Sequence, residues 1–385
     1  MRDIMDYYDD MEILTDSPIK DQVLAHVAAF DENAYTAVDV EAALQADYLT
    51  PSDFAALLSP AAEPFIPRMA KRAKYERDRY FGNSVFLFSP LYIANYCENR
   101  CVYCGFNAGM KIDRARLDDE EIEKECKAMA ATGLEEVLML TGESPTYSDI
   151  DYIANACRIA SKYFKNVGIE IYPVNVEDYR KLHEAGADFV TVFQETYDKE
   201  AYAKYHLGGR KRIFPYRFDA QERALRGGMR GVGFSALLGL TDFRKDTLAT
   251  GLHAWYLQRA YPHAEISLSC PRLRPIAGQE NIHDYSRVTE KQLFQVLLAY
   301  RIFMPFAGIV VSTRERNEFR DYTMKICATK ISAGSLTDIG SHSEEVEDTG
   351  DGQFDVADTR GLAEVIQNLK DEGMQPVLND YVYVG

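Results

Sequence analysis

The chain has 385 residues, of which 46% are hydrophobic and 27% charged, a balance typical of a globular protein with a large core. Its formal net charge of -17 excludes a basic surface of the kind that binds a nucleic-acid backbone. No run of about 18 apolar residues is present, so we expect no membrane-spanning helix. The acidic first residues lack the basic and apolar segments of a signal peptide.

The chain has seven cysteines, and their odd number and the large core argue against a disulfide framework. A reducing, cytoplasmic location fits this cysteine usage better. Three of the cysteines stand within one stretch of eight residues. The other four fall in predicted helices or strands, where we expect small buried side chains: Cys126, Cys157, Cys270 and Cys327.

Residues 35–79 have apolar side chains at helical spacing and predict a helical layer in front of the main domain. From residue 84 onward, short apolar runs alternate with amphipathic stretches, which is typical of parallel βαβ units. The predicted strands are residues 85–89, 136–140, 168–172, 189–193, 231–237, 264–269, 308–312 and 327–332. The predicted helices between them include residues 119–131, 150–164, 176–185, 246–261 and 289–303.

Eight strands alternating with helices predict an α/β fold, a (β/α)8 TIM-type barrel with its functional residues on the loops after the strands. A doubly wound open sheet is disfavoured because no glycine-rich dinucleotide fingerprint follows a strand. We expect an N-terminal helical extension over residues 1–80, the barrel over 81–340 and a C-terminal part over 341–385. In this last part, residues 343–358 are acidic and predict a surface loop or flap, and residues 359–372 predict a helix before an extended tail.

The three clustered cysteines form the motif CxxxCxxC at Cys97, Cys101 and Cys104, directly after the first predicted strand. Three thiolates on a short loop can bind three irons of a [4Fe–4S] cluster and leave the fourth iron open. A zinc site needs a fourth ligand at suitable spacing, and no histidine lies nearby. A redox-active CxxC pair leaves Cys97 without a role, and three inert thiols so close together are unexpected. The motif therefore favours the cluster.

The cysteine spacing and the YCGF that ends it resemble the motif of the radical S-adenosylmethionine superfamily. There, the open iron binds the amino and carboxylate groups of S-adenosylmethionine, and one electron cleaves the sulfonium bond to give a 5′-deoxyadenosyl radical. The likeness extends over residues 59–380 to the ThiH-type aromatic amino-acid lyases, and among them to the 2-iminoacetate synthases. The segments that resemble this family are PLYIANYCENRCVYCGFNAGMKI, LMLTGE, VFQETYDKEAYAKYHLGGRK, SCPRLRP and VSTRE.

The resemblance implies five contacts to S-adenosylmethionine. Gly142 and Glu143 follow the second predicted strand and would contact the methionyl amino group. Glu170 lies in an apolar strand, where a carboxylate is costly unless it is bound or paired, and would contact the ribose. A salt bridge inside the barrel mouth is its alternative. Arg217 would bind the methionyl carboxylate unless it is a surface arginine, and Phe106 follows the last motif cysteine.

The resemblance also implies an amino-acid substrate, whose carboxylate would be bound by Arg314 and Ser332. An arginine can bind a carboxylate through two parallel hydrogen bonds. Tyr92 would lie near the substrate amino group. An ion pair of Arg314 with Glu315 or with another acidic residue at the barrel top is the alternative for this arginine.

The function implied by the family is cleavage of the Cα–Cβ bond of L-tyrosine to 2-iminoacetate (dehydroglycine) and p-cresol for thiamine biosynthesis. Glu195 and His206 are candidates for the base on the phenol side. A flavodoxin or ferredoxin would supply electrons, and a thiazole synthase would receive the product. A tryptophan lyase remains an alternative, as does a non-catalytic zinc module. The hydrogenase-maturing tyrosine lyase is disfavoured because no cysteine follows Cys327.

Overall fold

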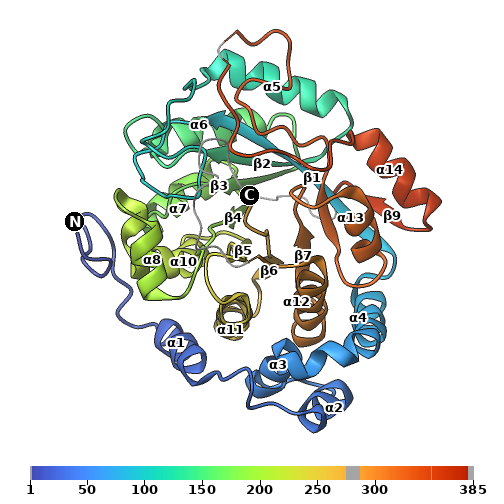
Figure 1. Cartoon of the computed structure of the whole chain (residues 1–385). Helices are drawn as coiled ribbons and strands as arrows, with labels where there is room; N and C mark the ends of the chain where they lie inside the picture. Colours follow the sequence, from blue (N-terminus) through green and yellow to red (C-terminus); the bar gives the residue numbers. More distant parts are fainter. Residues whose placement is uncertain (1, 275–286, 348, 380–385) are drawn as a thin grey trace.

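The computed structural model describes residues 2–274, 287–347 and 349–379. Eight parallel strands close into a barrel because β1 pairs with both β2 and β8, which confirms the predicted (β/α)8 fold (Figure 1). The barrel strands are β1 (Ser84–Ala94), β2 (Glu136–Thr141), β3 (Asn166–Glu170), β4 (Phe189–Thr191), β5 (Gly231–Ser235), β6 (Glu265–Ser269), β7 (Gly308–Val311) and β8 (Lys330–Ser332).

Helices surround the barrel and cover its outer face (Figure 1). They are α5 (Asp119–Ala131), α6 (Ile150–Ala160), α7 (Val176–Glu184), α8 (Lys199–Tyr205), α9 (Phe214–Phe218), α10 (Ala220–Arg226), α11 (Phe243–Ala260), α12 (Glu290–Phe303) and α13 (Asn317–Met324), with a 3-10 turn at η2 (Arg210–Arg212). In the part of the chain that the structure describes, no helix is both long and apolar enough to cross a membrane.

The last barrel strand is shorter than predicted, and a helix that the sequence did not predict precedes it. The strand predicted over residues 327–332 begins only at Lys330. The N–H groups of Cys327 and Ala328 both donate to the carbonyl of Thr323, at 2.9 Å each, so this stretch still belongs to the turn that ends α13. Apolar composition alone does not distinguish such a buried helix end from a strand.

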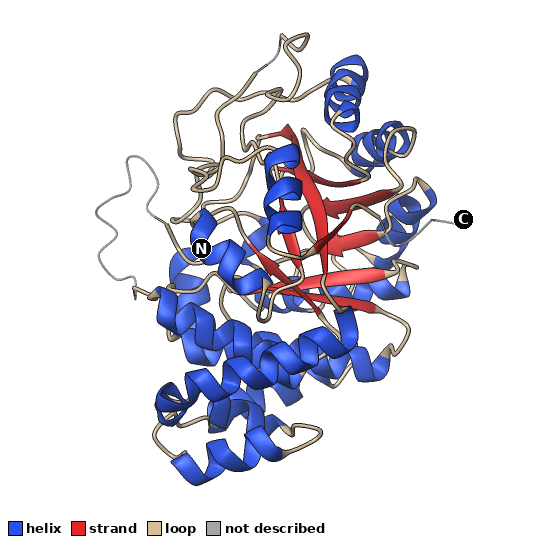
Figure 2. Cartoon of the chain, turned by 90° about the vertical axis from the view of Figure 1, so that its right-hand side faces the viewer, coloured by secondary structure: helices blue, strands red, loops and turns tan. Residues whose placement is uncertain are grey.

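The N-terminal layer is built from α1 (Ile19–Ala29), α2 (Ala37–Gln45), α3 (Pro51–Leu58), η1 (Pro60–Phe65) and α4 (Ile66–Phe81). It packs against α11 and α12 at one side of the barrel (Figure 2). Phe54 of α3 is fully buried and stacks on Phe303 of α12, with ring centroids 4.2 Å apart. The layer therefore completes the core rather than forming a separate unit.

The C-terminal part contacts the barrel at both ends of the barrel. Helix α14 (Leu362–Asp371) leads into β9 (Gln375–Val377), which pairs in parallel with the start of β1. Residues 349–358, predicted as part of a surface loop or flap, cross the barrel mouth. There Gly350 forms an antiparallel bridge with Ile339, and the Ala357 N–H donates to the Thr313 carbonyl at 2.8 Å. Residues 380–385 of the predicted tail lie outside the described residues.

The packing of the N-terminal layer predicts a large loss of stability on truncation of Phe54. We expect Phe54→Ala to lower the free energy of unfolding by about 3–5 kcal/mol, because it leaves a cavity between α3 and α12. Urea unfolding followed by circular dichroism measures this. The matched control is Tyr48→Ala, since Tyr48 is 88% exposed and should change stability little. Equal losses in the two variants would contradict the packing described.

Candidate active site

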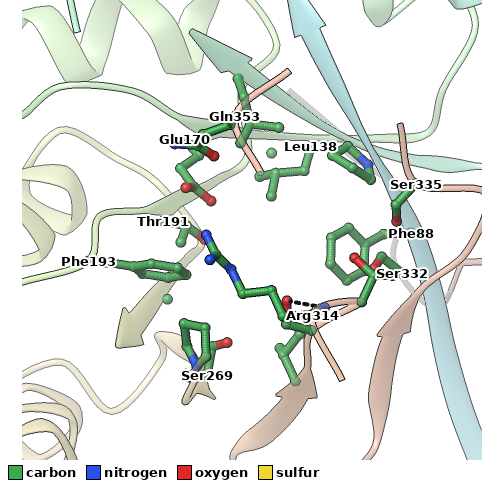
Figure 3. Close-up of a pocket in the computed structure, with 18 of the residues that line it drawn as sticks. Phe88, Leu138, Glu170, Thr191, Phe193, Ser269, Arg314, Ser332, Ser335 and Gln353 are labelled. Carbon is green, nitrogen blue, oxygen red and sulfur yellow. Dashed lines mark hydrogen bonds between the residues drawn. The ribbon is translucent and has the colours of Figure 1, made fainter. Parts of the chain in front are cut away.

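A cavity opens at the carboxyl ends of the barrel strands, the place where this fold positions functional side chains. The side chains that line it converge from strands on opposite walls (Figure 3). Glu170, Thr191 and Phe193 face Ser332 and Ser335 across the space, and the side chain of Arg314 extends into it, as the same view shows. All three motif cysteines line an adjoining pocket that shares Glu170 and Glu195 with this cavity. The residues around the cysteines there are Gly142, Glu143 and Arg217.

The cysteine loop is fixed by backbone hydrogen bonds to the segment after α8. The Arg100 N–H donates to the Gly208 carbonyl and the Leu207 N–H to the Arg100 carbonyl, at 3.0 Å each. Burial raises the pKa of Cys97 to about 11 and that of Cys101 well above its ordinary value, so these thiols need a strong positive charge to ionise. Iron supplies such a charge, and the buried Cys101 with the half-buried Cys97 and Cys104 fits a cluster site.

Within residues 2–274, 287–347 and 349–379, no three His, Cys, Asp or Glu side chains converge closely enough to bind a single metal ion. A cubane cluster makes a different demand, since each thiolate binds a separate iron.

Gly142 packs directly beneath the start of this loop. A Cβ atom at this position would lie 2.2 Å from the Tyr96 carbonyl oxygen, so only glycine fits. The Gly142 N–H donates to the Ala94 carbonyl at 2.8 Å, and the Glu98 N–H donates to the Glu143 carbonyl at 3.0 Å. The turn after β2 and the cysteine loop are thereby held in register.

Two acidic and two basic side chains form a buried network beside the cysteines. Arg217 pairs with Glu143 at 2.9 Å, and Lys211 pairs with Glu195 at 2.8 Å and with Glu143 at 3.5 Å. Burial alone would raise the pKa of Glu143, but Arg217 and Lys211 outweigh it and lower that pKa. Arg217 is only 5% exposed, so the alternative of a surface arginine is wrong.

Glu170 has no ion-pair partner within 4 Å among the described residues, so the alternative of a salt bridge is not supported there. Burial, followed by repulsion from Glu195, raises the pKa of Glu170 to about 7. Glu195 has a φ of 72°, the left-handed conformation that side chains other than glycine rarely adopt. Both carboxyl groups line the cavity.

Arg314 is a half-buried cation without a carboxylate partner among the described residues. Instead, Arg272 Nε donates to Glu315 Oε1 at 2.9 Å, and Arg274 Nη2 lies 3.4 Å from Glu315 Oε2. The alternative of an Arg314–Glu315 pair is therefore wrong. The Arg314 guanidinium stacks 3.6 Å from the ring of Phe354, and burial lowers its pKa. Such a group favours a bound anion.

Ser332 and Tyr92 lie on neighbouring strands beside this arginine. Ser332 lines the same cavity as Arg314 (Figure 3). The Tyr92 hydroxyl donates to Gln353 Oε1 at 3.0 Å, and its ring meets Phe106 edge-on, with centroids 5.9 Å apart. Burial raises the pKa of Tyr92, so its phenol stays protonated.

The two candidate bases lie in different surroundings. Glu195 lines the cavity, whereas His206 is fully buried and is absent from its lining. His206 Nδ1 lies 2.8 Å from the Tyr202 carbonyl, and Nε2 lies 2.7 Å from the hydroxyl of Tyr103, which does line the cavity. Burial lowers the pKa of His206. The structure thus brings Glu195, but not His206, to the cavity surface.

Sequence reasoning did not single out Lys211, Gln353 or Phe354 as site residues. Lys211 lies in the family-like segment that ends in HLGGRK, so its place in a motif could have identified it. Gln353 and Phe354 lie in an acidic stretch with weak apolar content, and no local pattern distinguishes them.

A family model described as the Radical SAM superfamily matches residues 91–250, and one described as the Biotin and Thiamin Synthesis associated domain matches residues 269–375. Over 350 residues the chain is 37% identical to the 2-iminoacetate synthases of Salmonella typhimurium and Escherichia coli. The match covers 91% of this chain and 92% of each relative. The chain belongs to the 2-iminoacetate synthase family of radical SAM enzymes. The predicted cofactors, a [4Fe–4S] cluster and S-adenosylmethionine, are those of this superfamily.

Solved structures agree with this membership. HydG, a maturase of the [FeFe]-hydrogenase, is similar with a TM-score of 0.85 at 29% identity, covering 94% of this chain and 81% of that chain. HydG from Carboxydothermus hydrogenoformans has the same TM-score at 27% identity, covering 96% and 86%. Methylornithine synthase (PylB) has a TM-score of 0.70 at 25% identity, covering 88% and 97%. The barrel and most of its extensions are therefore shared with radical SAM proteins.

The contact beneath the cysteine loop predicts that Gly142→Ala impairs cluster assembly. The new Cβ would collide with the Tyr96 carbonyl, directly before Cys97, and would displace the loop. We expect less than about half of the wild-type iron and sulfide after anaerobic reconstitution. The matched control is Gly208→Ala, where a Cβ meets only Arg100 at 3.7 Å. Wild-type iron content in Gly142→Ala would contradict the close packing.

Proposed function

We propose that this enzyme cleaves the Cα–Cβ bond of L-tyrosine to 2-iminoacetate and p-cresol, and that the 2-iminoacetate serves the thiazole branch of thiamine biosynthesis. The 37% identity to 2-iminoacetate synthases over nearly the whole chain supports this activity. The observation that supports an amino-acid substrate is that Arg314, in a cavity with aromatic walls, pairs with no carboxylate of the described residues. When bound, the cluster and S-adenosylmethionine supply the one-electron chemistry that removes a hydrogen atom from the substrate amino group.

On the cofactor side, Cys97, Cys101 and Cys104 would bind the cluster. The Glu143 carboxylate, already ionised, would accept hydrogen bonds from the methionyl ammonium group. Arg217, which pairs with it, would present its remaining N–H groups to the methionyl carboxylate.

Three further residues complete the cofactor pocket. Gly142 allows the backbone to approach the methionine closely. Glu170 would accept hydrogen bonds from the ribose hydroxyls. This suits a carboxyl group that has no ion-pair partner among the described residues. Phe106 forms an apolar wall beside the last motif cysteine and orients Tyr92 through its edge-on contact.

On the substrate side, Arg314 and Ser332 would bind the carboxylate of L-tyrosine and Tyr92 would contact its amino group. The aromatic wall formed by Phe88, Phe193 and their neighbours suits a phenyl ring. Closing the pocket around such a substrate excludes water from the reaction.

Glu195 is the better candidate for the phenol proton, because its carboxyl group reaches the cavity directly. His206 can act there only through Tyr103, to which its Nε2 is hydrogen-bonded.

Two partners follow from the chemistry. The cluster requires an electron at low potential, for which a flavodoxin or a ferredoxin in a reducing cytoplasm is suited. 2-Iminoacetate hydrolyses readily in water, so direct transfer to a thiazole synthase is favoured over release.

The experiment is an anaerobic assay of the reconstituted enzyme with dithionite, S-adenosylmethionine and L-tyrosine, read by mass spectrometry. We expect 5′-deoxyadenosine, p-cresol and glyoxylate, the hydrolysis product of 2-iminoacetate, to rise in equal amounts. A Cys97→Ala, Cys101→Ala, Cys104→Ala variant should produce none of them. If L-tryptophan is consumed and L-tyrosine is not, the substrate assignment is wrong, although the radical chemistry stands.

The assignment of Arg314 predicts a specific defect in Arg314→Lys. Lysine keeps the positive charge but loses the paired hydrogen bonds to a carboxylate, so we expect KM for L-tyrosine to rise about tenfold or more. The affinity for S-adenosylmethionine should not change. Arg316→Lys is the matched control, since Arg316 lies at the exposed rim and pairs with Glu290 at 2.7 Å. An unchanged KM in Arg314→Lys would remove this residue from the substrate site.

A further inference from the structure

Residues 349–358, called the C-terminal strap below, are anchored at both ends across the barrel mouth. At one end the Asp351 N–H donates to the Asp113 carbonyl at 3.0 Å, and Asn95 Nδ2 donates to the Asp351 carbonyl at 3.0 Å. At the other end Ala357 is bound to the Thr313 carbonyl. Between these anchors Gln353 borders the cavity (Figure 3). It also lines the pocket that contains the three motif cysteines.

Gln353 contacts both sides of the active site with a single side chain. Its Oε1 accepts a hydrogen bond from the Tyr92 hydroxyl at 3.0 Å. Its Nε2 donates to the sulfur of Cys104 at 3.7 Å, a length suited to an N–H···S bond. The backbone carbonyl oxygen of Gln353 would lie 2.5 Å from a Cβ atom at position 105. Because Gly105 has no Cβ, the strap can approach the cysteine loop this closely.

These two partners determine which way the amide points. The Tyr92 phenol remains protonated and donates, whereas a metal-binding thiolate only accepts. The opposite orientation would place the amide oxygen against the anionic sulfur, and the Tyr92 hydroxyl would then have to accept instead of donate. The observed arrangement therefore satisfies both neighbours, and the Tyr92 hydroxyl helps to keep the N–H directed at Cys104.

We propose that Gln353 is a positioning residue that raises the reduction potential of the cluster through Cys104, and that Tyr92 holds it in the orientation required. The inference rests on the proposed function for the roles of Cys104 and Tyr92. A hydrogen bond to a cluster sulfur favours the reduced cluster, because that state has one additional negative charge. Gln353 thereby connects the residue assigned to the substrate amino group with a ligand of the cluster.

The test is a redox titration of the reconstituted enzyme without substrate, in which the signal of the reduced cluster is followed by electron paramagnetic resonance. Gln353→Leu has a similar size but neither donor nor acceptor. At the wild-type midpoint potential, we expect its ratio of reduced to oxidised cluster to fall about threefold or more, the equivalent of one net hydrogen bond. Tyr92→Phe keeps the amide but removes its orienting partner, and should give a smaller fall in the same direction.

The matched control is Gln367→Leu, the same substitution on the exposed face of α14, where Gln367 Nε2 is bonded only to Asp371 at 2.7 Å. Its midpoint should equal that of the wild type. A wild-type midpoint in a cluster-loaded Gln353→Leu variant would overturn the inference. If Gln353→Leu assembles no cluster, the Tyr92→Phe variant is the test. A wild-type midpoint potential in Tyr92→Phe would then overturn the inference.

The redox titration and the tyrosine assay test the two proposals independently. A midpoint that shifts as expected in an enzyme that makes no p-cresol would contradict the proposed substrate alone. An enzyme that makes p-cresol while Gln353→Leu keeps the wild-type midpoint would contradict the role of Gln353 alone.

Discussion

The pairing of buried charge at the barrel mouth determines what each polar side chain there can do. A buried ion is costly unless another charge or a ligand compensates it. Glu143 and Glu195 are compensated by Lys211 and Arg217. Arg314 is left without a carboxylate among the described residues, and it is the cation that remains available to an anionic substrate. In the function we propose, the same principle separates a cofactor side, whose charges are already paired, from a substrate side, whose charge is paired when the substrate binds.

This arrangement needs support from the scaffold, because the turn that presents Glu195 has an unfavourable backbone conformation. Asp246 of α11 provides it by accepting hydrogen bonds from the Tyr197 N–H at 2.8 Å and the Thr196 hydroxyl at 3.0 Å. Burial raises the pKa of Asp246 to about 7, which shows that burying its charged form is itself unfavourable. A helix outside the barrel thus fixes the carboxyl group of Glu195 inside it, because its hydrogen bonds keep the turn in the strained conformation.

The sequence predicts the barrel and the cysteine loop because their signals are local. Apolar runs of four to seven residues alternate with amphipathic stretches, and three cysteines stand close together. The strap has no such signal. Gln353 lies about 250 residues from Cys104 in the chain, and only the closed barrel brings them into contact. An acidic segment is ordinarily solvated, and its composition gives no sign that the amide of Gln353 reaches the cysteine loop.

Resemblance and geometry contributed differently to the site. The likeness to the family indicates Arg314 and Ser332 as substrate residues, and the structure shows that Glu315 is bound by Arg272 and Arg274 and not by Arg314. For the phenol-side base the likeness left Glu195 and His206 open. Burial separates them, because the histidine is enclosed by Tyr103 and Tyr202. Which face of a helix end a histidine occupies depends on tertiary packing and is not encoded in the local pattern.

The most direct test of this account is the origin of the hydrogen atom transferred to 5′-deoxyadenosine. If Arg314 and Tyr92 place the amino group of L-tyrosine at the reacting position, the transferred hydrogen comes from nitrogen, where it exchanges with solvent. Turnover of L-tyrosine in D2O, read by mass spectrometry, should then give 5′-deoxyadenosine that contains one deuterium. 5′-Deoxyadenosine without deuterium would show that a carbon-bound hydrogen is taken, and would contradict the placement of the substrate.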